Sequence, residues 1–207
     1  ICGGMWTRDL AASIGVAAPL HACKHYYVLF EGVEGIDPTL PVLRDYDYCG
    51  YYKYDAGKLL VGAFEPNARP WGMDGISEDF CFDEIAGSFE HFEPLLMDAM
   101  RRVPALEKAG IQKFFCGPES FTPDVRYHLG ESAELKGCFV AAVLNSIGLQ
   151  SAGGVGKVMA DWIRDGIPPA DLWTVDIRRN MPFQINRKYL RERVTESLGL
   201  LYATHYP

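Results

Sequence analysis

The sequence predicts an α/β (α+β) fold in which a mainly antiparallel β-sheet domain is inserted into a partial, Rossmann-like nucleotide-binding domain. Residues 1–6 (ICGGMW) read as the end of a buried strand that runs into a glycine turn and a helix. A second glycine turn, residues 145–156, follows an apolar segment and leads into another helical pattern. The block between the two turns is rich in aromatic and β-branched residues, which favour strands. We therefore expect the two turns to share one domain and the block to form another.

Hydrophobic periodicity predicts four helices and a set of short strands. The helices are expected at residues 5–14, 88–103, about 152–165 and 186–198. The strands are expected at residues 25–31, 41–44, 111–115 and 138–144, together with a hairpin over 48–65 that turns at Asp55-Ala56-Gly57. Gly15 and Gly166 stop two of the helices. Residues 66–80 and 116–124 are expected to be loops because they carry several prolines and glycines.

Two of these patterns carry specific expectations about packing. Trp6, Leu10 and Ile14 recur every four residues on one helix face. In the third helix Val155, Val158, Met159, Trp162 and Ile163 form the stripe of a helix that faces a core. The strand at 138–144 is continuously apolar, which is typical of a strand buried on both faces.

Composition excludes several functional classes. The chain has 207 residues, 48% hydrophobic and 23% charged, with a net charge of −7. This acidity argues against nonspecific nucleic-acid binding, which needs Lys and Arg to meet phosphate. The apolar runs are too short to span a bilayer. The six cysteines are scattered without a CxxC pair, so reduced thiols are expected, in the cytoplasm of a bacterium or the mitochondrial matrix of a eukaryote.

The second glycine turn is the strongest local signal of a ligand site. Its glycines let backbone approach a ligand, and the N–H groups of the new helix favour an anion or an electron-rich carbonyl. A P-loop is excluded, because Ser151 replaces its first glycine and Val158 its Ser or Thr. A complete G-x-G-x-x-G is also absent from the sequence. The alternative remains that these glycines only allow a helix to pack closely on a sheet.

Other polar residues have two interpretations each. His21, Cys23 and His25 alternate along a predicted strand, so they share one face, which suits either a metal site or a face turned toward a core or cleft. A fourth metal ligand is not evident nearby. Tyr51, Tyr52 and Tyr54 suit hairpin packing or an amine-binding cage. Glu119 beside a cleft could meet a cationic substrate, whereas Asp124 could cap a turn.

Together these segments resemble the sarcosine and dimethylglycine dehydrogenase family of D-amino-acid-oxidase-like flavoproteins. The similarity is carried by residues 2–8 (CGGMWTR), 19–27 (PLHACKHYY), 116–124 (CGPESFTPD), 145–156, 176–179 (DIRR), 200–202 and 205–207. The regulatory subunit of pyruvate dehydrogenase phosphatase, a relative not known as a catalyst, shares much of the pattern. Neither an initiator methionine nor the leading glycine fingerprint precedes Ile1, so we expect an internal fragment.

The resemblance implies bound FAD and oxidation of an N-methyl amine such as sarcosine or dimethylglycine, by hydride transfer from a carbon next to nitrogen. The carbon would leave as formaldehyde or pass to tetrahydrofolate in a downstream region, and electrons would pass to oxygen or an electron-transfer flavoprotein. It implies an FAD-binding domain at 1–22 and 115–180, a substrate-covering domain at 23–114, and a helix and linker at 181–207. A non-catalytic flavin-binding regulatory protein is the alternative.

The resemblance also assigns site residues. Those expected near FAD are Gly3, Gly4 and Trp6 at the adenosine or pyrophosphate end, Gly117 and Pro118 near the isoalloxazine, and Ile147, Gly148 and Leu149 near its pyrimidine carbonyl. The candidates for catalytic groups are His25, Tyr52 and Glu119. No metal is expected.

Overall fold

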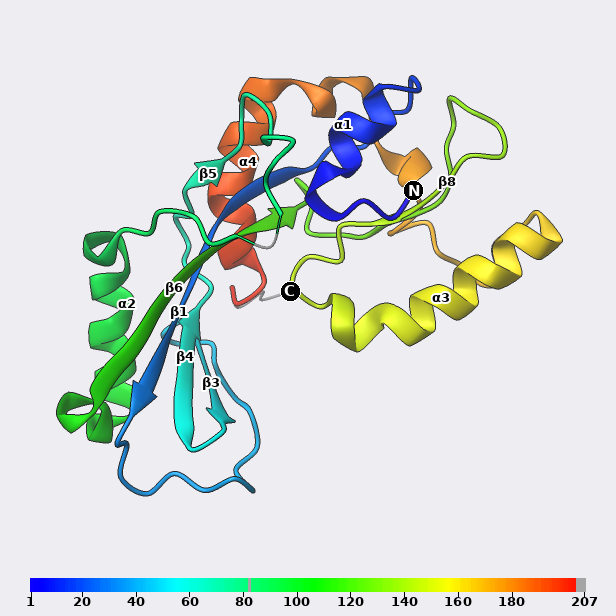
Figure 1. Cartoon of the computed structure of the whole chain (residues 1–207). Helices are drawn as coiled ribbons and strands as arrows, with labels where there is room; N and C mark the ends of the chain where they lie inside the picture. The colour runs from blue at the N-terminus through cyan, green and yellow to red at the C-terminus, as the bar shows by residue number, and fades with distance from the viewer. Residues whose placement is uncertain (82, 204–207) are drawn as a thin grey trace. The chain divides into compact units, whose positions relative to one another are not determined.

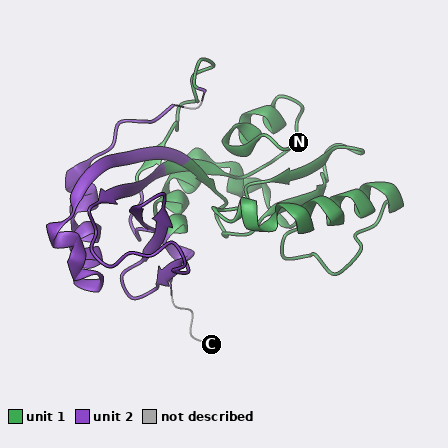
Figure 2. Ribbon diagram, turned by 60° about the horizontal axis from the view of Figure 1, so that its bottom comes forward, with its two compact units in different colours: residues 1–23, 69–80, 119–198 green, residues 24–68, 81–118, 199–207 purple. Residues whose placement is uncertain are grey.

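The computed structural model describes residues 1–81 and 83–203 (Figure 1). The chain divides into two compact units (Figure 2). Unit 1 comprises Ile1–Cys23, Arg69–Phe80 and Glu119–Leu198, and unit 2 comprises Lys24–Ala68, Cys81–Pro118 and Gly199–Pro207. Residues 69–80 thus group with unit 1, whereas the sequence analysis placed them in the inserted domain. The motif at 205–207 lies outside the described residues.

Unit 2 is built on an antiparallel sheet. Its strands are β1 (His21–Glu31), β2 (Leu43–Asp45), β3 (Gly50–Asp55), β4 (Lys58–Ala63) and β6 (Gly110–Phe121), in the order β2-β3-β4-β1-β6. β1 begins in unit 1, where Ala22 pairs with Trp71 of the short strand β5 (Pro70–Trp71), and β6 ends there. The predicted hairpin is confirmed. Its turn residues Ala56 and Gly57 have φ values of 48° and 83°, the left-handed pair that a type I′ turn requires.

One helix covers one face of this sheet. α2 (Phe89–Arg102) packs Phe92, Leu96 and Ala99 against Tyr26, Val28 and Val61, and the 3₁₀ helix η2 (Pro104–Lys108) adds Leu106. Ser88 caps α2 by accepting a hydrogen bond from the His91 N–H at 3.2 Å. The helix therefore begins five residues before Pro94, which stands inside it.

The expectation of a loop over 116–124 is wrong for residues 116–121, because β6 continues to Phe121. Among the described strands β6 pairs with β1 alone, so it is an edge strand. Pro118 can stand there without breaking the sheet, since an edge strand needs no N–H on its outer side.

Unit 1 surrounds a small antiparallel pair, β7 (His128–Glu131) and β8 (Phe139–Ala142). Its helices are η1 (Gly4–Trp6), α1 (Thr7–Ala12), α3 (Gly148–Asp165), η3 (Ile177–Arg179), η4 (Pro182–Ile185) and α4 (Arg187–Leu200), whose end reaches into unit 2. Ile1 lies beside β8, and its carbonyl accepts the Ala141 N–H at 2.9 Å. The first residues and the strand before the second glycine turn are therefore neighbours, as the sequence predicted.

Packing in unit 1 corrects three expectations. β8 is buried only at Val140 and Ala142, because a two-stranded sheet leaves its other face half-covered. In α3 only Met159 and Trp162 are buried, and Ile163 is 56% exposed. The predicted stripe is therefore narrower than a core helix needs, since α3 meets the rest of unit 1 along a single edge.

The α1 stripe is the third correction. Thr7 and Ala11 are the buried positions, while Trp6, Leu10 and Ile14 are exposed. At the other end of the chain the prediction holds, because Asn186 caps α4 by accepting the N–H groups of Lys188 and Tyr189. No helix in residues 1–81 and 83–203 is long and apolar enough to cross a membrane.

Candidate functional site

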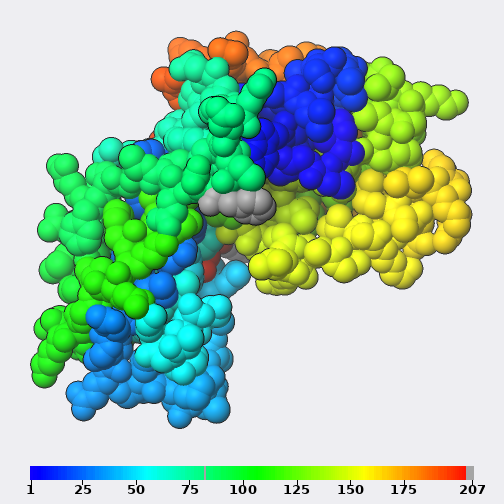
Figure 3. Space-filling view, viewed as in Figure 1, coloured from blue at the N-terminus to red at the C-terminus, as the bar shows by residue number. Residues whose placement is uncertain are grey.

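A pocket of about 450 Å³ opens in unit 1 where three segments meet. The N-terminal turn contributes Cys2 and Gly4, the end of β6 contributes Glu119 and Ser120, and the rest of the wall comes from residues 141–146, 148 and 149. In the space-filling view the dark-blue N-terminal segment lies beside the yellow-green segment that precedes α3 (Figure 3). The two glycine turns that the sequence singled out thus line one pocket.

The loop between β8 and α3 has a strained backbone. Val143, Asn145 and Ser146 have φ values of 54°, 45° and 66°. The left-handed region is unusual for any residue but glycine and most unfavourable for β-branched valine. Each such residue costs about 1–3 kcal/mol, and strain of this kind concentrates at functional sites. The loop therefore needs support from the surrounding structure.

Asn145 supplies that support. Its side chain is buried, and Oδ1 accepts the Thr122 N–H at 2.9 Å. Nδ2 donates to the Val143 carbonyl at 3.1 Å and to Thr122 Oγ1 at 3.3 Å. Thr122 Oγ1 in turn donates to the Arg126 carbonyl at 2.8 Å. One asparagine thus ties the strained loop both to itself and to the loop after β6.

The N-terminus of α3 presents backbone to the pocket. The helix begins at Gly148 rather than near Ala152, and no described side chain caps it at Ile147. The first N–H groups of a helix have no partner within it, and the helix dipole gives them partial positive charge. Leu149 also lines the pocket, and its side chain is fully exposed.

Gly148 is not required by the fold of the chain itself. Its φ lies outside the left-handed region, and a Cβ there would contact only Leu144, at an ordinary 3.5 Å. A Cβ at Gly153, Gly154 or Gly156 would meet nothing within 4 Å in the described chain. Close helix–sheet packing therefore does not explain these glycines, which removes the structural support for that alternative.

The N-terminal turn uses its glycines differently. Gly4 has a φ of 55°, which favours glycine. A Cβ at Gly3 would lie 3.2 Å from Thr7 Oγ1, so a side chain there would require Thr7 to shift. Trp6, which the resemblance placed beside FAD, is half-exposed and does not line the pocket.

The imidazole of His25 lies in unit 2, on the sheet face opposite α2. Its Nε2 is 3.2 Å from the Tyr51 hydroxyl, and the ring contacts Phe64 at 4.8 Å between centroids. The Tyr51 ring lies against Gly62, where an added Cβ would collide with it. Glycine at position 62 is therefore what lets Tyr51 lie beside His25. Tyr51 was named among the predicted hairpin tyrosines, but Tyr52 was chosen as the catalytic candidate, although alternation along the strand puts only one of the two on this face.

Tyr52, the predicted catalytic candidate, points the other way. It is 4% exposed in the core under α2, and burial raises the pKa of its phenol to about 12. The structure thus favours Tyr51 over Tyr52 as the tyrosine beside His25. Gly117 and Pro118 lie in β6 within unit 2, directly before the pocket residue Glu119.

A metal site is not formed by the parts of the chain that are described. No group of three His, Cys, Asp or Glu side chains in them is arranged to hold an ion. The His21 Nδ1–H donates to the Ala22 carbonyl at 2.8 Å, and burial lowers the pKa of the His21 imidazole. His21 and Cys23 are buried along β1, and His25, two residues on, is partly exposed.

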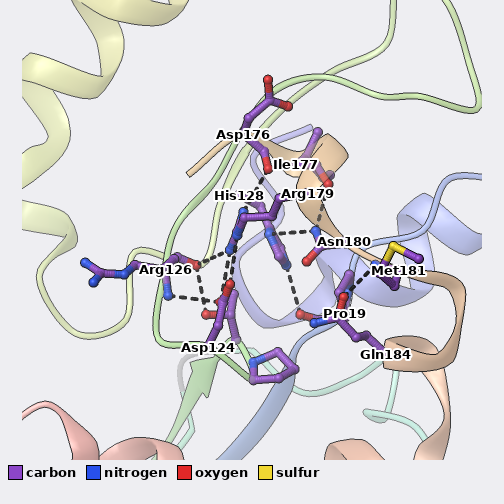
Figure 4. Close-up of polar contacts among 12 residues, drawn as sticks. Pro19, Asp124, Arg126, His128, Asp176, Ile177, Arg179, Asn180, Met181 and Gln184 are labelled. Carbon is purple, nitrogen blue, oxygen red and sulfur yellow. Dashed lines mark hydrogen bonds and ion pairs between the residues drawn. The ribbon is translucent and has the colours of Figure 1, made fainter. Parts of the chain in front are cut away.

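A second polar group in unit 1 is gathered around His128 and is called the His128 network; it comprises His128, Pro19, Asn180, Arg179 and Asp124 (Figure 4). His128 is fully buried, with Nε2 at 2.8 Å from the Pro19 carbonyl and Nδ1 at 3.3 Å from Asn180 Nδ2. Burial lowers its pKa to about 4. Arg179 donates to both carboxylate oxygens of Asp124 at 2.8 and 3.0 Å. Burial works to raise the pKa of Asp124, but the guanidinium outweighs it and holds that pKa below its usual range.

Comparison with known proteins decides the family. The family model described as FAD dependent oxidoreductase matches residues 1–162, and one described as FAD dependent oxidoreductase central domain matches residues 165–207. The chain belongs to the FAD dependent oxidoreductase family. This confirms the resemblance and the α/β fold that the sequence predicted.

Similar proteins place the chain within that family. It is 46% identical over 99% of its length to 4-methylaminobutanoate oxidase (formaldehyde-forming) of Paenarthrobacter nicotinovorans and 38% identical over its whole length to mitochondrial sarcosine dehydrogenase of Homo sapiens. It is 37% identical over its whole length to the mitochondrial pyruvate dehydrogenase phosphatase regulatory subunit of Mus musculus. The matches cover 25%, 22% and 24% of those proteins, so the chain spans about a quarter of their length.

A solved structure agrees. Glycine oxidase from Geobacillus kaustophilus superposes with a TM-score of 0.66 at 25% identity, covering 86% of this chain and 44% of that one. The residues at the unit 1 pocket fit part of the FAD of this family: a wall of bare backbone at Gly148 has room on its ligand side, and the first turn of α3 offers uncapped N–H groups.

Proposed function

We propose that this chain is part of an FAD-dependent enzyme that oxidises an N-methyl amine such as sarcosine, dimethylglycine or a longer methylamino acid. The observation that carries the proposal is the 46% identity to 4-methylaminobutanoate oxidase (formaldehyde-forming) across 99% of the chain. That relative's name describes both an N-methyl substrate and the fate of the methyl carbon. Sarcosine dehydrogenase, at 38% identity, is also named for an N-methyl amine.

When bound, FAD would accept a hydride, which is one proton with two electrons, from the carbon next to nitrogen. The amine carbon then becomes an iminium, and water added to it would release formaldehyde and the demethylated amine. Transfer of the carbon to tetrahydrofolate, and the choice of oxygen or an electron-transfer flavoprotein as acceptor, stay predictions.

We assign the flavin side of this chemistry to unit 1. The first-turn N–H groups of α3, at Gly148 and Leu149, would stabilise negative charge at the pyrimidine carbonyl, because fixed donors at a helix N-terminus need no reorganisation. Gly3 and Gly4 would serve the pyrophosphate end of the cofactor. Trp6, Gly117, Pro118 and Ile147 stay proposed cofactor residues.

We assign the substrate side to His25. Hydride leaves most readily when nitrogen carries a free electron pair, so a protonated amine must first lose its proton. The Tyr51 hydroxyl, 3.2 Å from His25 Nε2, can fix the orientation of the imidazole that would take this proton. Glu119 would attract the cationic amine; Tyr52 is a weaker proposal, because its ring lies in a core.

The competing function is a regulatory flavoprotein without turnover, which the 37% identity to the phosphatase regulatory subunit supports over the whole chain, below the 46% identity that supports the enzyme. Anaerobic addition of sarcosine, dimethylglycine and 4-methylaminobutanoate to the full-length protein separates the two. We expect at least one to bleach the flavin absorbance. A bound flavin that none of them reduces would support the regulator.

Relatives named as mitochondrial and a bacterial relative both occur, so we propose a mitochondrial matrix or bacterial cytoplasmic setting according to source.

A further inference from the structure

Strain in the described chain is concentrated in one place. Six non-glycine residues have positive φ, and three of them, Val143, Asn145 and Ser146, lie in the loop before α3. A fourth, Val125, lies in the loop that Thr122 begins. The Asn145 side chain joins these two loops through hydrogen bonds to the backbone and hydroxyl of Thr122. These four of the six strained residues therefore lie in two loops that hydrogen bonds join.

The same loop forms the pocket wall. Val143, Asn145 and Ser146 line the pocket, and the Ile147 N–H donates to the Leu144 carbonyl at 3.0 Å immediately before α3 begins. The direction in which the first N–H groups of α3 point thus depends on the loop's conformation. Only Asn145 has a side chain that bonds both within the loop, at Val143, and outside it, at Thr122, among the contacts of the described residues.

We propose that Asn145 is a positioning residue, which holds the loop before α3 so that the N–H groups of Gly148 and Leu149 face the flavin. The proposal rests on the flavin role of the unit 1 pocket. Asparagine suits this task for two reasons: it tolerates the left-handed conformation better than most residues, and its amide can accept one backbone hydrogen bond while donating another. Asn145 would act through the backbone and need not touch the cofactor.

The test compares two asparagines of unit 1 in the full-length protein. Asn145→Gly keeps a residue that accepts a φ of 45° and removes only the side-chain bonds. Asn180→Ala is the matched control, because Asn180 also bonds a backbone carbonyl, that of Ile177 at 2.8 Å, but lies in the His128 network. The readouts are the FAD dissociation constant of the apoprotein and the flavin midpoint potential, measured by chemical reduction without substrate.

For Asn145→Gly we expect FAD affinity to fall about tenfold or more, as for the loss of buried hydrogen bonds. The potential should fall by about 30 mV, which is a tenfold change in a two-electron equilibrium. Asn180→Ala should lower the melting temperature of the apoprotein but change affinity less than about twofold. Asn145→Asp, which keeps the acceptor for the Thr122 N–H, should recover part of the loss.

Wild-type affinity and potential in Asn145→Gly would overturn the proposal, and so would a loss that Asn180→Ala reproduces. If Asn145→Gly does not fold, Thr122→Val is the second variant, because it removes the hydroxyl that accepts from Asn145 Nδ2. It should lower FAD affinity and the flavin potential, and unchanged values would overturn the proposal. Neither readout uses an amine. If the protein binds FAD but the bound flavin is reduced by none of the methylamines, the proposed function is contradicted and this inference still stands.

Discussion

The loop after β6 meets two polar groups of opposite character in unit 1. On one side it contributes Asp124 to the His128 network and leads into β7, which begins at His128; there Arg179 pairs with Asp124 and the His128 imidazole contacts the Pro19 carbonyl (Figure 4). On the other side Thr122 supports Asn145 and the strained pocket loop, which ends in uncapped helix N–H groups. Most polar atoms of the network have partners within the chain, although Asn180 Oδ1 has none among the described residues, whereas the first N–H groups of α3 at the pocket have no side-chain cap.

This difference separates scaffold from site by physical criteria. A buried polar group whose hydrogen bonds close within the chain contributes to stability. A strained backbone that presents donors to a pocket costs stability and is retained for a ligand. Substitutions in the network should therefore change stability without changing flavin affinity, and substitutions at the pocket wall should do the reverse.

The largest effect is expected from breaking the ion pair of the network. Arg179→Ala leaves Asp124 without its guanidinium and removes a bond to the Arg126 carbonyl. A fully buried pair would cost more, but Asp124 is 35% exposed, so solvent screening reduces the loss to about 2–3 kcal/mol. Arg178→Ala is the control, since the Arg178 side chain is 48% exposed against 14% for Arg179, and its pair with Asp176 should contribute less than about 1 kcal/mol. Urea denaturation with equal losses for both would contradict the distinction.

The second prediction concerns pH. The folded pKa of His128 is about 4, below the ordinary 6.5, so between these values the unfolded chain binds a proton that the folded chain does not. Stability should thus fall by about 2 kcal/mol from about pH 7 to about pH 5 on account of His128. His21, whose pKa is also lowered by burial, acts in the same direction. The difference between wild type and His128→Gln isolates His128, and parallel curves for the two proteins would refute it.

At the pocket wall the effect should move to flavin binding. Gly148→Ala adds a Cβ that the chain accepts, since its nearest neighbour is Leu144 at 3.5 Å. If a flavin approaches this backbone, the methyl group should weaken FAD affinity about tenfold, or about 1.4 kcal/mol, with little change in apoprotein stability. Gly148→Val should lose more. Equilibrium titration of apoprotein with FAD measures this, and unaltered affinity would make Gly148 an ordinary helical residue.

The smallest effect sharpens the same comparison within α3. Gly156→Ala also meets open space, but position 156 lies beyond the first turn and does not line the pocket. It should stabilise the protein by about 0.5–1 kcal/mol, because glycine in a helix interior is unfavourable relative to alanine. FAD affinity should stay the same. Weaker flavin binding in Gly156→Ala would extend the ligand contact past the first turn.

Sequence periodicity and local chemistry predicted those elements whose causes are local. The hairpin at Ala56-Gly57 and the helix that begins after Asn186 follow from turn and cap preferences that a few residues determine. Periodicity failed where neighbours decide burial. The stripe of α3 looked like a core face, yet Ile163 is exposed because a helix buries only what other elements cover.

By itself the sequence determined the family, the antiparallel block and the two glycine turns as the places for a ligand. Only the tertiary structure decided that both turns line one pocket, that Tyr51 rather than Tyr52 lies beside His25, and that Asn145 supports the strained loop. These contacts join residues distant in sequence, such as Thr122 and Asn145. Periodicity reports which face of an element a residue is on, whereas long-range packing decides what that face meets.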